Sequence, residues 1–180
     1  HVQFLSGKLQ DIKKLTDLEQ LDVITANALF DLVSYEQFDT FAAQIACYQV
    51  CLMATLNYYE TSFLPFSEDD APYIKHYHTH MTRPQDFGAA MGPNCTEEML
   101  DLLAAHEMKC EQEGSQWHLK RYDTTMQHYI LHFMEHAIKD LNFSDQEVKK
   151  LEAWIHEKKQ MSRDHQLEII IDHSDIFAYP

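Results

Sequence analysis

Apolar residues recur every three or four positions along most of the chain, which is the spacing of one buried helix face. The first such stretch has leucine or isoleucine at positions 5, 9, 12 and 15 and predicts a short helix. Helix starts are often marked by Ser or Thr followed three residues later by Glu or Gln, the capping-box pattern. This pattern occurs at residues 16–19, 34–37 and 144–147, so we expect helices to begin there.

The longest apolar stretch lies between residues 41 and 56, where only Gln44, Gln49 and Thr55 are polar. A helix that is apolar on nearly all sides belongs inside a bundle of other helices. The stretch is too short, and its two glutamines make it too polar, for an easy membrane span. We therefore predict a long helix over residues 35–59 that forms the centre of the fold.

Other helices are expected between the remaining breaks in the apolar pattern, over about residues 18–33, 70–82, 96–113, 115–141, 144–159 and 162–171. The 115–141 helix is expected to bury one face, which consists of Leu119, Tyr122, Met126, Tyr129, Ile130, Phe133, Ala137 and Leu141. Residues 83–95 contain two prolines and two glycines and predict a long loop.

The fold predicted from this pattern is all-α, a single domain over residues 1–180. It is an irregular helical bundle of about seven helices around the buried central helix, residues 35–59. The three isoleucines at 169–171 are compatible with a strand, but a lone strand would have nothing to pair with. We therefore expect no sheet.

The charge balance excludes several partners. The chain has 29 acidic and 14 basic residues and a formal net charge of -15, so it lacks the basic surface that nucleic acid or an anionic membrane would require. We expect no membrane insertion. The four cysteines form no Cys-x-x-Cys pair and there is no targeting segment, which favours the reducing cytoplasm.

Acidic residues and methionines concentrate in the middle of the sequence. Residues 61–115 carry 10 acidic and 3 basic residues, a net charge of -7. Flexible methionines beside carboxylates suit the capture of basic, amphipathic protein segments. The expected anchors of such a groove are Met81, Phe87, Met91, Met99 and Met108, and its expected acidic rim is Glu97, Glu98 and Asp101.

This pattern favours a non-catalytic, acidic adaptor or chaperone-like protein that binds one or more partner proteins, or a subunit of a larger complex. An alternative is that the acids keep the domain soluble and the methionines fill its core. No catalytic residues and no cofactor are predicted, because the chain has no Gly-x-Ser-x-Gly elbow and no glycine-rich phosphate loop.

The histidines suggest a second alternative, a helical metal-binding protein or metalloenzyme. Two imidazoles four residues apart on a helix can bind one transition metal. This spacing occurs at His76 and His80 and again at His128 and His132. A di-iron carboxylate centre is disfavoured, because the chain has no Glu-x-x-His pattern.

Overall fold

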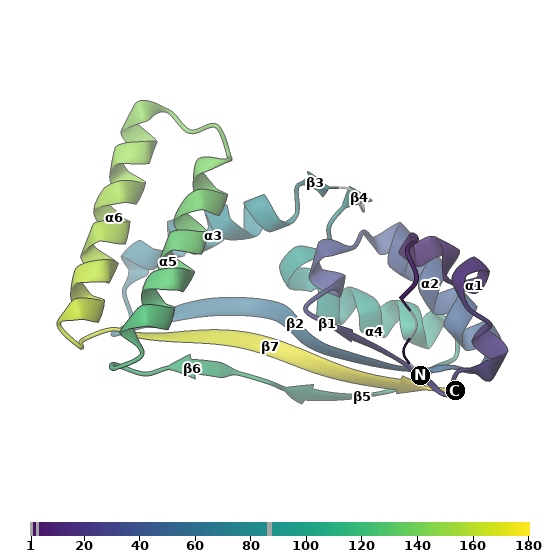
Figure 1. Ribbon diagram of the computed structural model, residues 1–180. Coiled ribbons are helices and arrows are strands. Elements are labelled where there is room, and N and C mark those ends of the chain that lie inside the picture. Colours follow the sequence, from purple (N-terminus) through teal and green to yellow (C-terminus); the bar gives the residue numbers. More distant parts are fainter. Residues whose placement is uncertain (1, 3, 86–87) are drawn as a thin grey trace. The chain divides into compact units, whose positions relative to one another are not determined.

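The computed structural model describes residues 2, 4–85 and 88–180, and the fold it shows is α/β (Figure 1). A mixed sheet of five strands and a separate two-stranded sheet accompany the helices. The all-α prediction is therefore wrong. The chain forms two compact units: the first comprises residues 1–59, 82–115 and 173–180, and the second comprises residues 60–81 and 116–172.

Two long strands, β2 (Cys51–Leu64) and β7 (Glu168–Tyr179), contribute to both units. The other elements of the first unit are η1 (Leu9–Asp11), α1 (Ile12–Leu15), η2 (Leu18–Gln20), β1 (Val23–Asn27), η3 (Phe30–Leu32), α2 (Tyr35–Cys47), β3 (Pro84–Gln85), β4 (Gly88–Ala89), η5 (Gly92–Asn94), α4 (Cys95–Ala105) and β5 (Lys109–Gly114). The other elements of the second unit are η4 (Glu68–Asp70), α3 (Ala71–Met81), β6 (Trp117–Leu119), α5 (Thr124–Lys139) and α6 (Asp145–Arg163).

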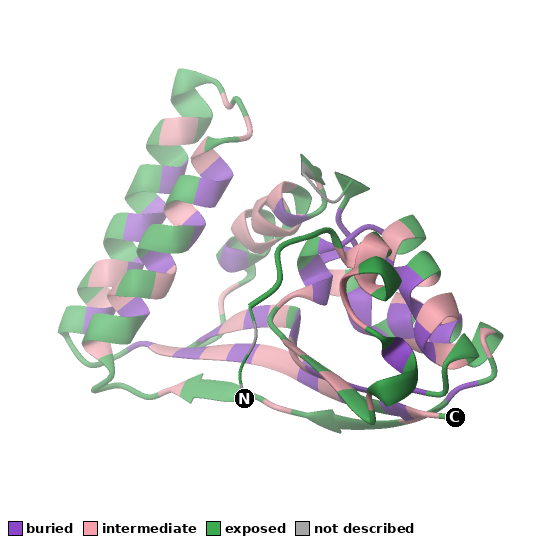
Figure 2. Ribbon diagram, turned by 45° about the vertical axis from the view of Figure 1, so that its right-hand side comes forward, coloured by how far each residue is buried: buried purple, intermediate pink, exposed green. Residues whose placement is uncertain are grey.

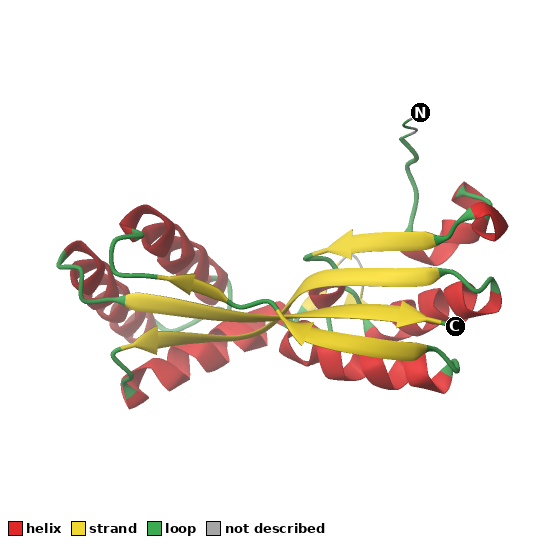
Figure 3. Ribbon diagram, turned by 90° about the horizontal axis from the view of Figure 1, so that it is seen from below, coloured by secondary structure: helices red, strands yellow, loops and turns green. Residues whose placement is uncertain are grey.

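The five-stranded sheet has the order β1-β2-β7-β5, and β6 also pairs with β7. Strands β1 and β2 are parallel, in register from Val23 opposite Cys51 to Asn27 opposite Thr55, and α2 is the crossover between them. Strand β5 is antiparallel to β7, with Lys109 opposite Tyr179. In the first unit, the strands lie on one side and the helices on the other (Figure 3).

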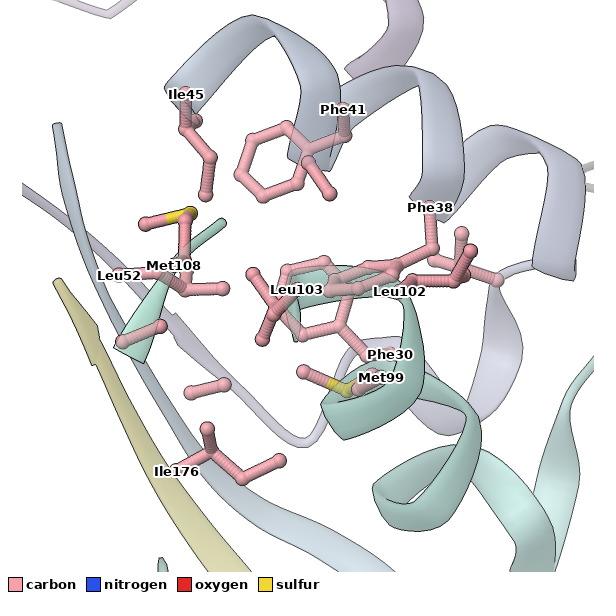
Figure 4. Packing of buried hydrophobic residues seen from close by; sticks show 14 of the residues in the cluster. Phe30, Phe38, Phe41, Ile45, Leu52, Met99, Leu102, Leu103, Met108 and Ile176 are labelled. Carbon is pink, nitrogen blue, oxygen red and sulfur yellow. The ribbon is translucent and has the colours of Figure 1, made fainter. Parts of the chain in front are cut away.

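Aromatic rings of η3 and α2 form the centre of the first unit's core (Figure 4). Phe30 packs edge-to-face on Phe38, with ring centroids 4.9 Å apart, and lies 5.7 Å from Phe41. Met99 and Leu103 of α4 complete the layer over the strands. Each fully buried phenylalanine is worth about 3–5 kcal/mol relative to alanine, so this cluster is the main stabilising feature of the unit.

The apolar stretch predicted as one central helix is in fact a helix and a strand. Helix α2 starts at its Ser34 cap, which accepts a hydrogen bond from the Gln37 amide as the capping pattern indicates, but the helix ends at Cys47. Gln49 then adopts a left-handed conformation with φ 56°. The Gln49 and Val50 amides donate to the carbonyls of Ala46 and Ile45 at 3.1 and 2.9 Å, which is the Schellman helix ending.

The same ending occurs without glycine at two other helices. Glu107 after α4 and His165 after α6 have φ 62° and 55°. In each case, the amide of this residue and the amide of the next one donate back into the last turn, as with Met108 to Leu103 at 3.0 Å and Gln166 to Met161 at 2.8 Å. Strands β2, β5 and β7 follow these three turns. The glycine that usually marks a helix end is absent at these three positions, so the sequence pattern predicts that each helix continues.

In the second unit, α5 and α6 pack side by side, and their buried residues line the faces that meet (Figure 2). The Ser144 capping box is present as predicted and starts α6. The predicted buried face of the 115–141 helix is mostly wrong, because Tyr122, Met126, Tyr129 and Phe133 are exposed. The side chains that are buried instead are Gln127, Leu131, Met134, Ala137 and Ile138, of which only Ala137 was predicted.

Candidate functional site

The methionines predicted to anchor a partner are core residues. Met81, Met91, Met99 and Met108 are each between 0% and 7% exposed, and the last three belong to the core cluster of the first unit. Phe87 lies outside the described residues. The methionine-lined groove on which the adaptor function depended is therefore absent from the described part of the chain, and that function is corrected.

The predicted acidic rim lies on α4. Glu97 and Asp101 are exposed, and Glu98 is half-buried. Burial, followed by the charges of Glu36 and Glu97, raises the pKa of Glu98. Binding of a basic protein by these residues stays a prediction that no observation tests.

The four histidines of the metal hypothesis all lie in the second unit, on α3 and α5. His76 packs against Phe143 at 4.6 Å, and His80 lies 3.5 Å from the Asp140 carboxylate. Across residues 2, 4–85 and 88–180, no three His, Cys, Asp or Glu side chains are placed to hold one metal ion. The helical metalloprotein alternative is corrected as well.

The parallel pairing of β1 and β2 ends at Asn27, the last residue of β1, opposite Thr55, whereas β2 itself runs on to Leu64. The carboxyl end of this paired segment forms one edge. In open α/β sheets, ligands bind outside this edge. The Thr55 hydroxyl donates to the Asn27 side chain there, and the Ala28 amide donates to the Thr55 carbonyl at 2.9 Å. Ala28 directly follows β1 and Leu56 lies within β2, and both have left-handed conformations, with φ 49° and 56°. Non-glycine residues in this conformation are strained, and such strain clusters at functional sites.

Polar contacts hold the chain rigidly just beyond this edge. The Asp175 carboxylate accepts hydrogen bonds from the Leu56 amide at 2.8 Å and from the Ser115 hydroxyl at 2.6 Å. The next residue, Asn57, donates to the Ser174 carbonyl at 2.8 Å. The Asn57 side-chain oxygen is fully buried and accepts no hydrogen bond from any described residue.

Asp31 is a buried carboxylic acid in η3, four residues after the end of β1. Its side chain is 9% exposed, and its Oδ1 has no hydrogen-bond partner in the described part of the chain. Burial raises its pKa. It faces the start of α4, where its charge and, more strongly, burial raise the pKa of Cys95 to about 12. The Thr96 hydroxyl beside it is likewise buried without a partner among the described residues.

Backbone contacts fix the position of Asp31. The Met91 amide donates to the Val33 carbonyl at 2.9 Å, and Ser34 forms a β-bridge with Ala90. Gly88 has φ 87°, and a Cβ there would lie 2.9 Å from the Ser34 Cβ, so only glycine fits this close approach. These contacts tie the segment after β1 to the segment before α4, and they place Asp31 and Thr96 on a fixed frame.

This edge therefore combines an amide, two hydroxyls and a carboxyl whose pKa is raised by burial. Such a group can donate a hydrogen bond to a ligand when it is protonated, or accept a proton from the ligand when it is ionised. The sequence patterns did not identify Asn27, Asp31, Thr55 or Asn57, because both strands were interpreted as helix. The available signal was that polar side chains stand at the ends of the apolar stretches 23–26 and 50–54.

None of the helices that the structure describes is long and apolar enough to cross a membrane. No protein-family model matches the chain, and no curated protein matches it in sequence.

Several solved structures show weak similarity. One is phosphoethanolamine N-methyltransferase 2 of Haemonchus contortus with S-adenosyl-L-methionine, which has 13% identity and a TM-score of 0.37 over 89% of this chain and 33% of that one. Another is the cyclopropane synthase MmaA2 of Mycobacterium tuberculosis, with 12% identity and a TM-score of 0.37 over 89% of this chain and 57% of that one. The chain thus spans between a third and somewhat over half of these structures. At such scores they assign neither a family nor an activity to it.

The prediction of a non-catalytic protein is withdrawn. It rested on an all-α bundle, whereas the chain has a parallel β1–α2–β2 unit with a polar carboxyl edge.

Proposed function

We propose that this chain is part of an α/β group-transfer enzyme, with methyl transfer as its reaction, and that its ligand binds at the edge where the parallel pairing of β1 and β2 ends. The observation that carries this proposal is the buried Asp31 carboxyl, whose Oδ1 has no partner among the described residues and which lies four residues beyond the end of a parallel strand. A buried polar group without a partner costs about 1–3 kcal/mol. That cost is accounted for if a bound ligand supplies the missing partner.

The edge residues fit a polar organic ligand. Asn27 and Thr55 offer an amide and a hydroxyl, and Asp31 offers a carboxyl whose pKa is raised by burial. Methyl transfer is chosen because the similar structures are named as methyltransferases or cyclopropane synthases, while the placement of the ligand rests on this chain's own geometry. S-adenosylmethionine would supply the methyl group. A nucleophile that takes a methyl group gives up a proton, and Asp31, in its ionised carboxylate form, is the group that would accept it.

The test is calorimetric binding of S-adenosylmethionine and S-adenosylhomocysteine to the protein at its natural length. We expect binding, and we expect Asn27→Ala and Asp31→Asn each to weaken it by about tenfold. The matched control is Asn94→Ala, because Asn94 is exposed and its side chain makes no capping bond. No binding of either compound at 1 mM would refute methyl transfer. If the compounds bind but neither variant weakens the binding, the placement of the ligand site at this edge is refuted.

We also propose that the protein works in the cytoplasm. In support, all four cysteines are free thiols in the structure, as expected in a reducing compartment. Fractionation of the source cells, with detection of the protein in each fraction, tests this location.

A further inference from the structure

A pocket of about 660 Å³ lies wholly within the second unit, between the start of α3 and the first three turns of α6. Its size falls in the range of small-molecule sites, roughly 300–1,000 Å³. Its lining combines aromatic rings with carboxylates. It shares no lining residue with the edge where β1 ends, and nothing in the proposed function uses it.

One wall of the pocket is a fixed pair of aromatic rings. Tyr73 and Trp154 stack with centroids 4.5 Å apart and planes at 16°. The Trp154 indole donates to the buried Asp70 carboxylate at 2.8 Å, and Lys158 binds the same carboxylate at 2.7 Å. The Tyr73 hydroxyl donates to the Lys150 carbonyl at 3.2 Å. The wall is therefore organised before any ligand arrives, which lowers the entropic cost of binding.

Other parts of the lining are also held in place. Phe143 packs edge-to-face on His76 at 4.6 Å. The Glu147 carboxylate accepts hydrogen bonds from the Ser144 amide at 2.8 Å and from its hydroxyl at 2.6 Å. These bonds lower the pKa of Glu147, so the carboxylate stays ionised at the pocket.

The pocket carries an excess of negative charge. Glu68, Asp69 and Glu157 line it together with Glu147, and Lys150 is the one lysine in the lining. Within the ranges that the structure describes, the carboxylates of Glu68, Asp69 and Glu157 make no ion pair or hydrogen bond. After burial, the charges of Asp69 and Glu157 are what raise the pKa of Tyr73, which shows that both carboxylates lie close to this ring.

We propose that this pocket binds a small organic ammonium cation, held against the aromatic wall and neutralised by the carboxylates around it. Ammonium groups are attracted to the faces of tyrosine and tryptophan rings. The carboxylates supply the opposite charge, and fixed rings suit a cation that carries alkyl groups better than a hydrated metal ion. The occupant is a free small molecule, because the pocket has the volume of a ligand site and is closed behind by the Asp70–Trp154–Lys158 contacts.

The test follows the indole N–H of Trp154 in ¹H–¹⁵N spectra of the full chain while choline chloride or spermidine is added. Trp117, on β6, is the internal reference. We expect a saturable shift confined to Trp154, with a dissociation constant of about 1 mM or below. Sodium chloride at equal ionic strength should give no such shift. The absence of saturation up to 10 mM of both cations would overturn the proposal.

Paired variants separate a built site from general charge attraction. The double variant Asp69→Asn/Glu157→Gln should weaken choline binding by about tenfold. The matched control, Asp101→Asn/Glu111→Gln, removes the same two charges from exposed positions in the first unit and should leave it unchanged. Equal weakening in both would show nonspecific attraction and overturn the proposal.

The aromatic contribution has its own test. Tyr73→Phe keeps the ring and should retain binding within about twofold, whereas Tyr73→Leu should lose about tenfold. A thermal melt of each variant checks that it is folded. If Tyr73→Leu does not fold, the double variant Asp69→Asn/Glu157→Gln decides whether the pocket binds the cation. Equal affinities of the Phe and Leu variants for choline would exclude a contribution of the Tyr73 ring to binding. Tighter binding of a lysine peptide than of choline would show that the pocket takes protein segments, which would overturn the small-molecule assignment.

Discussion

The substitution Gln49→Gly distinguishes the fold observed from the fold that the apolar pattern predicts. In the structure, Gln49 ends α2 in a left-handed conformation, with φ 56°. Its side chain is exposed, so shortening it removes no packing. In a continuous helix over residues 35–59, the same residue would lie in the interior of the helix. Glycine at position 49 should stabilise the left-handed turn and destabilise a continuous helix. Whether the free energy of unfolding rises or falls therefore distinguishes the two folds.

The expected magnitude follows from two opposing terms. A left-handed conformation costs a residue with a Cβ about 1–2 kcal/mol, and glycine does not pay this cost. Glycine also has more freedom in the unfolded chain, which takes back about 0.5–1 kcal/mol. We therefore expect Gln49→Gly to raise the free energy of unfolding by about 0.5–1 kcal/mol. For a chain of this size, that corresponds to an increase in Tm of roughly 1–4 °C.

The assay is urea unfolding followed by circular dichroism. The matched control is Ala43→Gly, in the interior of the same helix, which should lower the free energy of unfolding by about 1 kcal/mol. Glu107→Gly should behave like Gln49→Gly, because Glu107 has the same role after α4. If Gln49→Gly destabilises the protein as much as Ala43→Gly does, the left-handed turn is refuted and the continuous helix is restored.

Three further predictions concern buried polar groups. Asp70→Asn leaves the Lys158 ammonium, 2% exposed, without its carboxylate, and should lower the free energy of unfolding by about 3–5 kcal/mol; a much smaller loss in urea unfolding would contradict the buried pair. Because burial raises the pKa of Asp31, its contribution to stability is present below its unfolded pKa and is lost as the pH rises through the folded value. Asp31→Asn should therefore stabilise the protein at pH 7, and unfolding curves at descending pH should show the gain shrinking; a gain independent of pH would contradict the buried acid. Cys95 is fully buried, with a pKa of about 12, whereas Cys47 is exposed, so alkylation and mass spectrometry should modify Cys47 in the folded protein and Cys95 only in urea.

Local features of the fold were predictable because their signals are local. Ser34 and Ser144 were identified as helix caps, and both accept the expected amide hydrogen bond. A cap acts within four residues, so the sequence contains the whole interaction. The apolar stretch 41–56 was expected to form the centre of the fold as one helix. Phe41, Ile45 and Leu52 are fully buried, but the stretch is a helix followed by a strand.

The candidate site was not predictable from the same patterns. Asn27 and Thr55 come together because β1 and β2 pair in parallel across a helix. Asp31 and Cys95 are 64 positions apart in the sequence and come close only after η3 packs against η5 and α4. No spacing rule connects such residues, so only the packed fold identifies them as neighbours.

Taken alone, the sequence determined which stretches are apolar, where several helices begin and that the surface is strongly acidic. Tertiary structure decided whether an apolar stretch became helix or strand. A strand at isoleucines 169–171 was rejected because no second strand was expected to pair with it. In the structure these residues pair with residues 117–119, which were themselves predicted to be helical. A helix makes its hydrogen bonds within four residues, whereas a strand makes them with a distant segment. With Gln49, Glu107 and His165 ending helices where glycine is usual, the chain gives no local sign that a strand follows.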